Sequence, residues 1–227
     1  MPDWLFDASA WVIPVVLAVT LHEAAHGWMA ERFGDHTARA MGRISFNPLR
    51  HIDRFGTIIL PALLLLLRSP VLFGYARPVP VNFRNLTPPR LGMFMVAMAG
   101  PGTNVLLALI SGLLLHLEAV MTPEQAPWLF LNLYRSLMIN CVLAVFNLIP
   151  ILPLDGGRVV ASLLSGGLRR AFDRLERYGI VIVLLGLLVP PLLGFDLAQH
   201  VIGRPATWLL EQVMGATGNG SAEDTLK

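Results

Sequence analysis

Charged residues are scarce in this sequence. Asp, Glu, Lys and Arg together make up 14% of the 227 residues, whereas a soluble domain carries about 25%. Hydrophobic residues reach 55%, and the mean hydropathy is +0.62. A soluble chain of this length needs a polar shell, because small domains expose much surface for their volume. The composition therefore excludes an ordinary soluble protein, a disordered chain and a nucleic-acid-binding protein with a basic face.

Cysteine and early basic residues are also nearly absent. Cys141 is the one cysteine, so neither an intramolecular disulfide nor a thiolate cluster for a metal is possible. No Lys or Arg precedes Arg32, which leaves a cleaved signal peptide without its basic start. We expect the first apolar stretch to remain in the mature protein. We also expect one integral-membrane domain over residues 1–214 and a polar, disordered tail over residues 215–227.

Long apolar stretches are what the sequence does contain. About 20 apolar residues in a helix cross the roughly 30 Å core of a bilayer. Four stretches meet or approach this length: Ala8–Ala30, Leu91–Leu117, Trp128–Leu152 and Tyr178–Phe195. A fifth, Phe55–Leu67, makes only about 20 Å of helix and has arginines on both flanks, so we interpret it as re-entrant. Residues 197–213 form either an interfacial amphipathic helix or a short further span.

The arginines are concentrated in two of the connections between these stretches. Residues 31–90 and 158–177 together hold 14 of the 17 basic residues, and the other connections are acidic or neutral. The positive-inside rule places such arginine-rich connections in the cytoplasm. The N-terminus then lies outside, and the four spans alternate in direction.

Three ionisable residues interrupt the first span. The sequence His22-Glu23-Ala24-Ala25-His26 places two imidazoles four residues apart, on the same face of a helix. Both can therefore reach one metal ion, with the glutamate beside them as general base. This HExxH arrangement is typical of zinc metalloproteases. The alternative is a polar patch that only holds helices together, or an inactive relic, although burying such groups in a membrane is costly.

Zinc in a catalytic site needs a third protein ligand, and Asp155 is the candidate. Pro150 and Pro153 must end the third apolar helix, while Gly156 and Gly157 permit a tight left-handed turn. The chain could then direct the Asp155 carboxylate into the bundle. On spacing alone, a simple turn in which the aspartate caps the next element is an equal alternative.

Together these motifs resemble the site-2 protease family of intramembrane zinc metalloproteases, in its compact branch without PDZ or CBS domains. The resemblance covers roughly residues 15–165. It rests on separate segments in the right order, namely His22–His26, Gly42–Pro48, Gly74–Asn82, Ala99–Asn104 and Asn147–Gly157. The family's Asn-Pro-Asp-Gly signature is spread out here, from Asn147 to Gly156.

The resemblance implies an all-α polytopic membrane protein. Its fold would be a bundle of about four to six transmembrane helices with a short re-entrant segment and a small membrane-dipping β-loop at Gly74–Asn82. It also implies one zinc ion per chain, bound by His22, His26 and Asp155. Glu23 would activate water, and Asn147 would hold the substrate backbone or the oxyanion.

Two further sets of residues each allow two interpretations, one functional and one structural. The segment Arg77, Pro78, Val79, Pro80 and Val81 suits an edge strand, because proline cannot sit in a central strand. Such an edge could hold an unwound substrate by strand pairing, or the segment could be a structural loop at the lipid headgroups. Asn104 is either a polar substrate contact near the site or part of a helix kink.

The sequence thus predicts an intramembrane zinc endopeptidase of a bacterial or archaeal cell membrane, with its active site opening toward the cytoplasm. Its partners would be the lipid bilayer and a transmembrane protein substrate, and not nucleic acid. The main alternative is a catalytically inactive membrane scaffold that binds membrane proteins. A protease of prenylated C-termini would need a well-placed downstream glutamate ligand, and a transporter relay would need ionisable residues on more spans.

Overall fold

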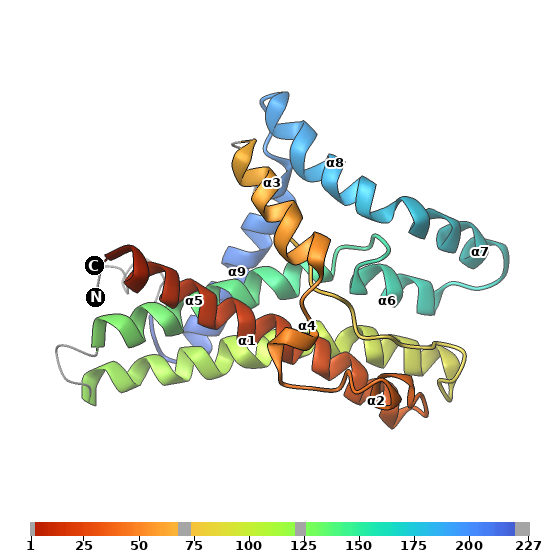
Figure 1. Ribbon diagram of the computed structural model, residues 1–227, viewed down its shortest axis with the longest axis horizontal. Coiled ribbons are helices and arrows are strands. Elements are labelled where there is room, and N and C mark those ends of the chain that lie inside the picture. Colours follow the sequence, from red (N-terminus) through yellow and green to blue (C-terminus); the bar gives the residue numbers. More distant parts are fainter. Residues whose placement is uncertain (1–2, 68–73, 121–125, 221–227) are drawn as a thin grey trace.

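The computed structural model describes residues 3–67, 74–120 and 126–220, and the regular elements of these ranges are all helical (Figure 1). The long helices are α1 (Asp3–Arg32), α4 (Pro89–Leu114), α5 (Ala126–Asn147) and α8 (Gly179–Leu192). The shorter α-helices are α2 (Thr37–Ala40), α3 (Leu60–Leu66), α6 (Asp155–Leu163), α7 (Gly166–Leu175) and α9 (Arg204–Ala216). Short 3₁₀ or π turns complete the order: η1 (Pro48–Arg50), η2 (Arg54–Ile59), η3 (Leu115–Val120), η4 (Glu176–Tyr178) and η5 (Gln199–Gly203).

Four helical stretches of the described chain are long and apolar enough to cross a membrane, as predicted. They are Ser9–Arg32, Pro89–Leu117, Pro127–Asn147 and Gly166–Leu192. The fourth starts earlier than the sequence indicated, because α7, η4 and α8 follow one another almost without a break. Its first turns carry Arg169, Arg170, Arg174 and Arg177, which belong to the connection over residues 158–177 in the sequence analysis.

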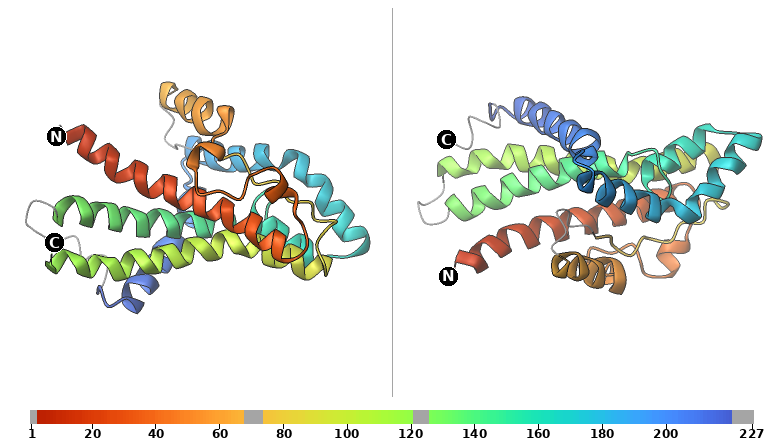
Figure 2. Two further views of the ribbon diagram at one scale, coloured as in Figure 1. Left: turned by 60° about the horizontal axis from the view of Figure 1, so that its bottom comes forward. Right: turned by 90° about the horizontal axis from the view of Figure 1, so that it is seen from above.

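Helices α1, α4 and α5 pack against one another and form the centre of the molecule, with α6 against α4 and α9 against α5 and α4. The start of α1 lies at the same end of the molecule as the end of α4 and the start of α5. α2 and α7 lie at the opposite end (Figures 1 and 2). One apolar cluster joins α4, α5 and α9 through residues such as Ala108, Leu137 and Met214. A second joins the end of α1 to α4 and α6 through Ala30, Val96 and Ala161.

Residues 197–213 lie in one helical stretch that contains η5 and most of α9, and α9 buries Ala206, Leu210, Val213 and Met214. This stretch is not among the four in the described chain that are apolar enough to cross a membrane. It packs on the bundle, and its placement at the membrane interface stays a prediction. The helix continues through Gly215 to Ala216, so the expected tail is ordered at its start, while residues 221–227 lie outside the described chain.

α5 ends shortly before Pro150 and Pro153, as these two prolines predict. The helix ends at Asn147, the connection turns back, and α6 begins at Asp155. The expected left-handed glycine turn is wrong, because Gly156 and Gly157 are helical. They are needed for close packing: a Cβ at Gly156 would lie 2.1 Å from the carbonyl oxygen of Leu148. The connection therefore folds directly over the first turn of α6.

Of two further expected substructures, the β-loop is not formed by strands, and the re-entrant segment is helical. Residues 74–82, the expected β-loop, contain no strand and run as irregular chain beside α1. The stretch expected to be re-entrant forms η2 and α3, with exposed apolar side chains that include Ile58, Leu63 and Leu66. This exposure suits contact with lipid, and the re-entrant placement stays a prediction.

Candidate metal centre and active site

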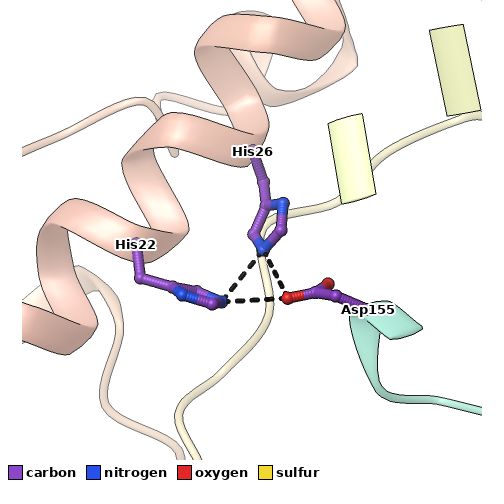
Figure 3. A group of neighbouring side chains, drawn as sticks. All are labelled: His22, His26 and Asp155. Carbon is purple, nitrogen blue, oxygen red and sulfur yellow. Dashed lines mark hydrogen bonds and ion pairs between the residues drawn. The ribbon is translucent and has the colours of Figure 1, made fainter. Parts of the chain in front are cut away.

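The histidines of the first span point at the same spot as Asp155 (Figure 3). The Nε2 atoms of His22 and His26 lie 3.0 Å apart. Each lies 3.3 Å from Oδ2 of Asp155, which the first turn of α6 carries toward α1. His22, His26 and most of Asp155 are shielded from solvent. The structure thus brings together the three residues predicted as ligands, and it favours the ligand interpretation of Asp155 over a simple turn.

The protonation state of His26 follows from its partner. Its Nδ1 lies 2.8 Å from the carbonyl oxygen of Val96. A carbonyl oxygen can only accept a hydrogen bond, so Nδ1 carries a proton, and in the neutral imidazole that binds a metal Nε2 then presents its lone pair to the site.

The protonation state of His22 follows from a longer chain of contacts. Asn140 donates through Nδ2 to the carbonyl oxygen of Ser136, at 2.8 Å, which fixes the orientation of the Asn140 amide. Its Oδ1 must then accept from Nδ2 of Asn104, also at 2.8 Å. Asn104 is left to accept through Oδ1 from Nδ1 of His22, at 2.6 Å. Nδ1 of His22 therefore also carries a proton, and the neutral form of this imidazole directs a lone pair inward from Nε2.

With both imidazoles in the neutral form that binds a metal, three acceptor atoms converge at one point. In the described chain, Oδ2 of Asp155 is buried and receives no hydrogen bond. Such a set repels itself unless a cation lies among its members. Ligand atoms about 2.0–2.1 Å from a tetrahedral zinc ion lie about 3.3 Å from one another, which matches the observed separations of 3.0 and 3.3 Å. The donor set of two imidazoles and one carboxylate fits a catalytic zinc site, with a fourth position left open.

Gly100 of α4 makes room for the two imidazoles, a role that sequence analysis missed. A Cβ built on Gly100 would lie 2.4 Å from Nε2 of His26 and 2.6 Å from Nε2 of His22. Any side chain here would occupy the space where the ligand atoms converge. The only signal in the sequence was the Gly-Pro-Gly run at residues 100–102, which predicted a kink rather than a contact.

The three converging atoms open onto a cavity of about 530 Å³. Glu23, Asn147, Arg158 and Glu176 are among its lining residues, and Arg158 forms an ion pair with Glu176. Asn147 donates through Nδ2 to the carbonyl oxygen of Leu143, one turn earlier in α5, at 3.0 Å. The predicted general base and the predicted oxyanion residue therefore share one cavity with the candidate metal ligands.

Comparison with known proteins agrees with this site. Residues 10–126 and 121–190 match the profile of peptidase family M50. The chain belongs to this family, which is that of the site-2 proteases. M50 membership confirms the resemblance deduced from the motifs, and zinc is the cofactor of the family.

Several curated bacterial relatives of this M50 chain are named as candidate zinc metalloproteases. YwhC of Bacillus subtilis is 40% identical over 185 residues, which cover 80% of both chains. Rip2 of Mycolicibacterium smegmatis is 29% identical over 178 residues, 78% of this chain and 66% of the relative. Rip2 of Mycobacterium tuberculosis is 30% identical over 181 residues, 79% and 67% of the two chains. No solved structure matches the chain.

Of the residues predicted to bind the substrate of this M50 chain, one contacts a candidate ligand and three line the cavity. Asn104 is fully buried and contacts His22 and Asn140, so in this structure it orients a candidate ligand rather than lining the cavity. Pro78, Val79 and Val81 do line the cavity. The segment is tied to the end of α1, where Oδ2 of Asp35 accepts from the backbone N–H of Asn82 at 2.7 Å. Burial alone would raise the pKa of Asp35, but hydrogen bonds from Thr37, Asn82 and Asn85 outweigh it and lower the pKa.

Proposed function

We propose that this chain is an intramembrane zinc endopeptidase that hydrolyses peptide bonds within or near transmembrane segments of other membrane proteins. The observation that carries the proposal is the convergence of three buried acceptor atoms beside Glu23, in a cavity among membrane-spanning helices. Two neutral imidazoles and a carboxylate present only acceptor atoms to one another, which is the donor set that a metal ion requires. Family M50 supplies the independent support.

In this proposal each site residue has a defined task. His22, His26 and Asp155 hold the zinc ion, which supplies Lewis acidity that acidifies water and polarises a peptide carbonyl. Glu23 takes the proton from the attacking water and returns it to the leaving amide nitrogen. Asn147, which lines the same cavity, offers its amide to the substrate backbone or to the developing oxyanion.

The second large cavity supports an apolar substrate. It measures about 850 Å³, is lined mainly by apolar residues, and shares Val19, Tyr75 and Phe146 with the catalytic cavity. A transmembrane helix reaching the zinc must unwind locally, because its carbonyl groups are engaged in internal hydrogen bonds. The adjoining apolar space would accommodate the part of the substrate that stays in the membrane.

The proposed orientation places the arginine-rich end in the cytoplasm. α2 and α7, within or next to the two arginine-rich segments, lie at one end of the molecule, and the N-terminus lies at the other (Figure 1). The Arg158–Glu176 ion pair on the wall of the catalytic cavity provides a polar route for water from that side. The packing of α9 on α4 and α5 supports one domain that includes the C-terminal helix.

The deciding experiment separates zinc binding from catalysis. Wild type, Glu23→Gln and Asp155→Asn are purified in detergent, and zinc content and cleavage of model transmembrane substrates are measured. We expect one zinc ion per chain in wild type and Glu23→Gln, cleavage by wild type alone, and loss of zinc in Asp155→Asn. A wild type without zinc, or equal cleavage by wild type and Glu23→Gln, would overturn the proposal. Zinc and substrate binding without cleavage would instead indicate the inactive scaffold.

A further inference from the structure

The backbone of one short segment contacts the candidate general base directly. Pro78 and Pro80 have no N–H group, so Val79 carries the only backbone N–H in the run from 78 to 80. That N–H donates to Oε2 of Glu23 over 2.7 Å. The two prolines thus flank the single donor that reaches the carboxylate.

The side chain of Val79 is held on the same face of α1. Glu23 and Gly27 are four residues apart, so both lie on one side of the helix. Val79 is 7% exposed, and a Cβ at Gly27 would lie 3.0 Å from its Cγ1 atom. The absence of a side chain at Gly27 therefore lets the segment approach closely enough for its N–H to reach Glu23.

Neighbouring contacts hold the backbone of the segment in register. Arg43, which is 8% exposed, donates through Nη2 to the carbonyl oxygens of Arg77 and Pro78, over 2.8 and 3.3 Å. The N–H of Arg77 donates to the carbonyl oxygen of His51 over 2.8 Å. The N–H groups of Arg77 and Val79 and the carbonyl groups of Arg77 and Pro78 are thus already engaged within the protein and do not pair with a substrate.

We propose that Val79 is a positioning residue whose backbone N–H holds the Glu23 carboxylate in place for catalysis. This inference rests on the proposed function. A glutamate carboxylate is itself a good zinc ligand, and Glu23 is adjacent to one candidate ligand in the sequence. An N–H bound to one carboxylate oxygen restrains the group from turning onto the metal and leaves the other oxygen for the attacking water. Arg43 supports this arrangement by binding the carbonyl groups of the two preceding residues, Arg77 and Pro78.

The contact can be tested without measuring activity, by amide hydrogen exchange. The flanking prolines simplify the measurement, because a peptide spanning residues 76–81 contains only three amide N–H groups, those of Arg77, Val79 and Val81. We expect exchange at Val79 to accelerate about tenfold or more in Glu23→Ala, in both zinc-free and zinc-loaded protein, as a hydrogen bond to a charged group is lost. Glu31→Ala is the matched control, since Glu31 lies on the same helix and pairs with Arg39. Equal exchange at Val79 in wild type and Glu23→Ala would overturn the inference.

The catalytic consequence is tested by deleting the N–H alone. Replacing Val79 by its α-hydroxy acid turns the amide into an ester and keeps the side chain; the genetic variant Val79→Pro also lacks the N–H but changes the side chain. We expect kcat to fall about tenfold to hundredfold with zinc content retained and KM changed less than about twofold. Val79→Ala, which keeps the N–H, should retain zinc and lose at most about threefold in kcat.

The outcomes distinguish this inference from the proposed function. A rise in KM at constant kcat in the ester variant would make the segment a substrate-binding element and overturn the positioning role. Cleavage by the ester variant at the wild-type rate would also overturn it and leave the proposed function intact. A wild type that cleaves nothing would overturn the proposed function and, with it, the catalytic role of Val79, whatever the exchange data show about the contact.

Discussion

Helices α4 and α8 are both strongly apolar, yet they serve different purposes. In the span that contains α4, 39% of the most apolar window is buried inside the protein, against 11% for the span that contains α8. The buried residues of α4 include Gly92, Gly100, Gly112, Asn104 and Ser111. Those of α8 are Gly179, Val183 and Leu187.

The difference shows what marks an internal helix in a membrane protein. Lipid and protein interior are equally apolar, so hydropathy does not distinguish the two environments. Small residues permit close approach of neighbouring chains, and buried amides supply directed hydrogen bonds. α4 therefore shapes the candidate metal site through Gly100 and Asn104, whereas most of the α8 surface is free to face lipid.

The largest effect is expected from filling the gap that α4 leaves at the metal site. Gly100→Ala places a Cβ about 2.4 Å from Nε2 of His26, so the imidazoles cannot keep their positions. We expect zinc affinity to fall more than about 100-fold, beyond the effect of losing a hydrogen bond to a ligand, and proteolysis to be lost. Zinc content after purification and cleavage of a transmembrane substrate measure both effects.

Two glycines provide matched controls for this substitution. A Cβ at Gly102 of α4 or at Gly186 of α8 would meet no atom within 4 Å. Gly102→Ala and Gly186→Ala should therefore keep zinc and activity close to wild type. Full zinc binding by Gly100→Ala would show that α4 does not shape the metal site and so does not differ from α8 in this respect.

A smaller effect is expected from replacing Asn140, which supports His22 through the amide of Asn104. Asn140→Leu removes the acceptor of the Asn104 amide, so Asn104 can turn and His22 loses its fixed partner. We expect zinc affinity, measured by chelator competition, to fall about 10–100-fold, as for other partners of metal ligands. Asn132→Leu is the control, because Asn132 is also buried on α5 but bonds to the carbonyl oxygen of Trp128. An equal loss in both variants would contradict a specific role of Asn140.

Several features of the site could be predicted because their signals are local. The spacing of His22 and His26 on one helix face follows from helical periodicity, and the end of α5 follows from Pro150. Asp155 could be proposed as a ligand from its place after Pro150 and Pro153, but a turn was equally compatible with the spacing, and only the family resemblance favoured the ligand. Its position depends on the connection after α5 folding over α6, which involves the close contact of Gly156 with Leu148.

Other features depend on pairings that the sequence does not mark. Gly100 is 74 residues from His26, and a glycine offers no polar signal of its proximity to a metal site. The role of Asn140 becomes visible only when its amide is seen to meet that of Asn104. The early start of the fourth span was missed because the charged residues of α7 hide its continuity with α8.

The smallest effects are expected where apolar side chains are shortened without touching the site. Met93 of α4 is 7% exposed, whereas Leu185 of α8 is 55% exposed. Met93→Ala leaves a cavity against packed neighbours, and core truncations of this kind cost about 2–5 kcal/mol. We expect the low end of this range, since lipid solvates the lost surface and the packing contribution remains. Leu185→Ala should change the free energy of unfolding by less than about 0.5 kcal/mol. Reversible unfolding in mixed micelles measures both, and a larger loss for Leu185→Ala would mean that a partner covers α8 in the membrane.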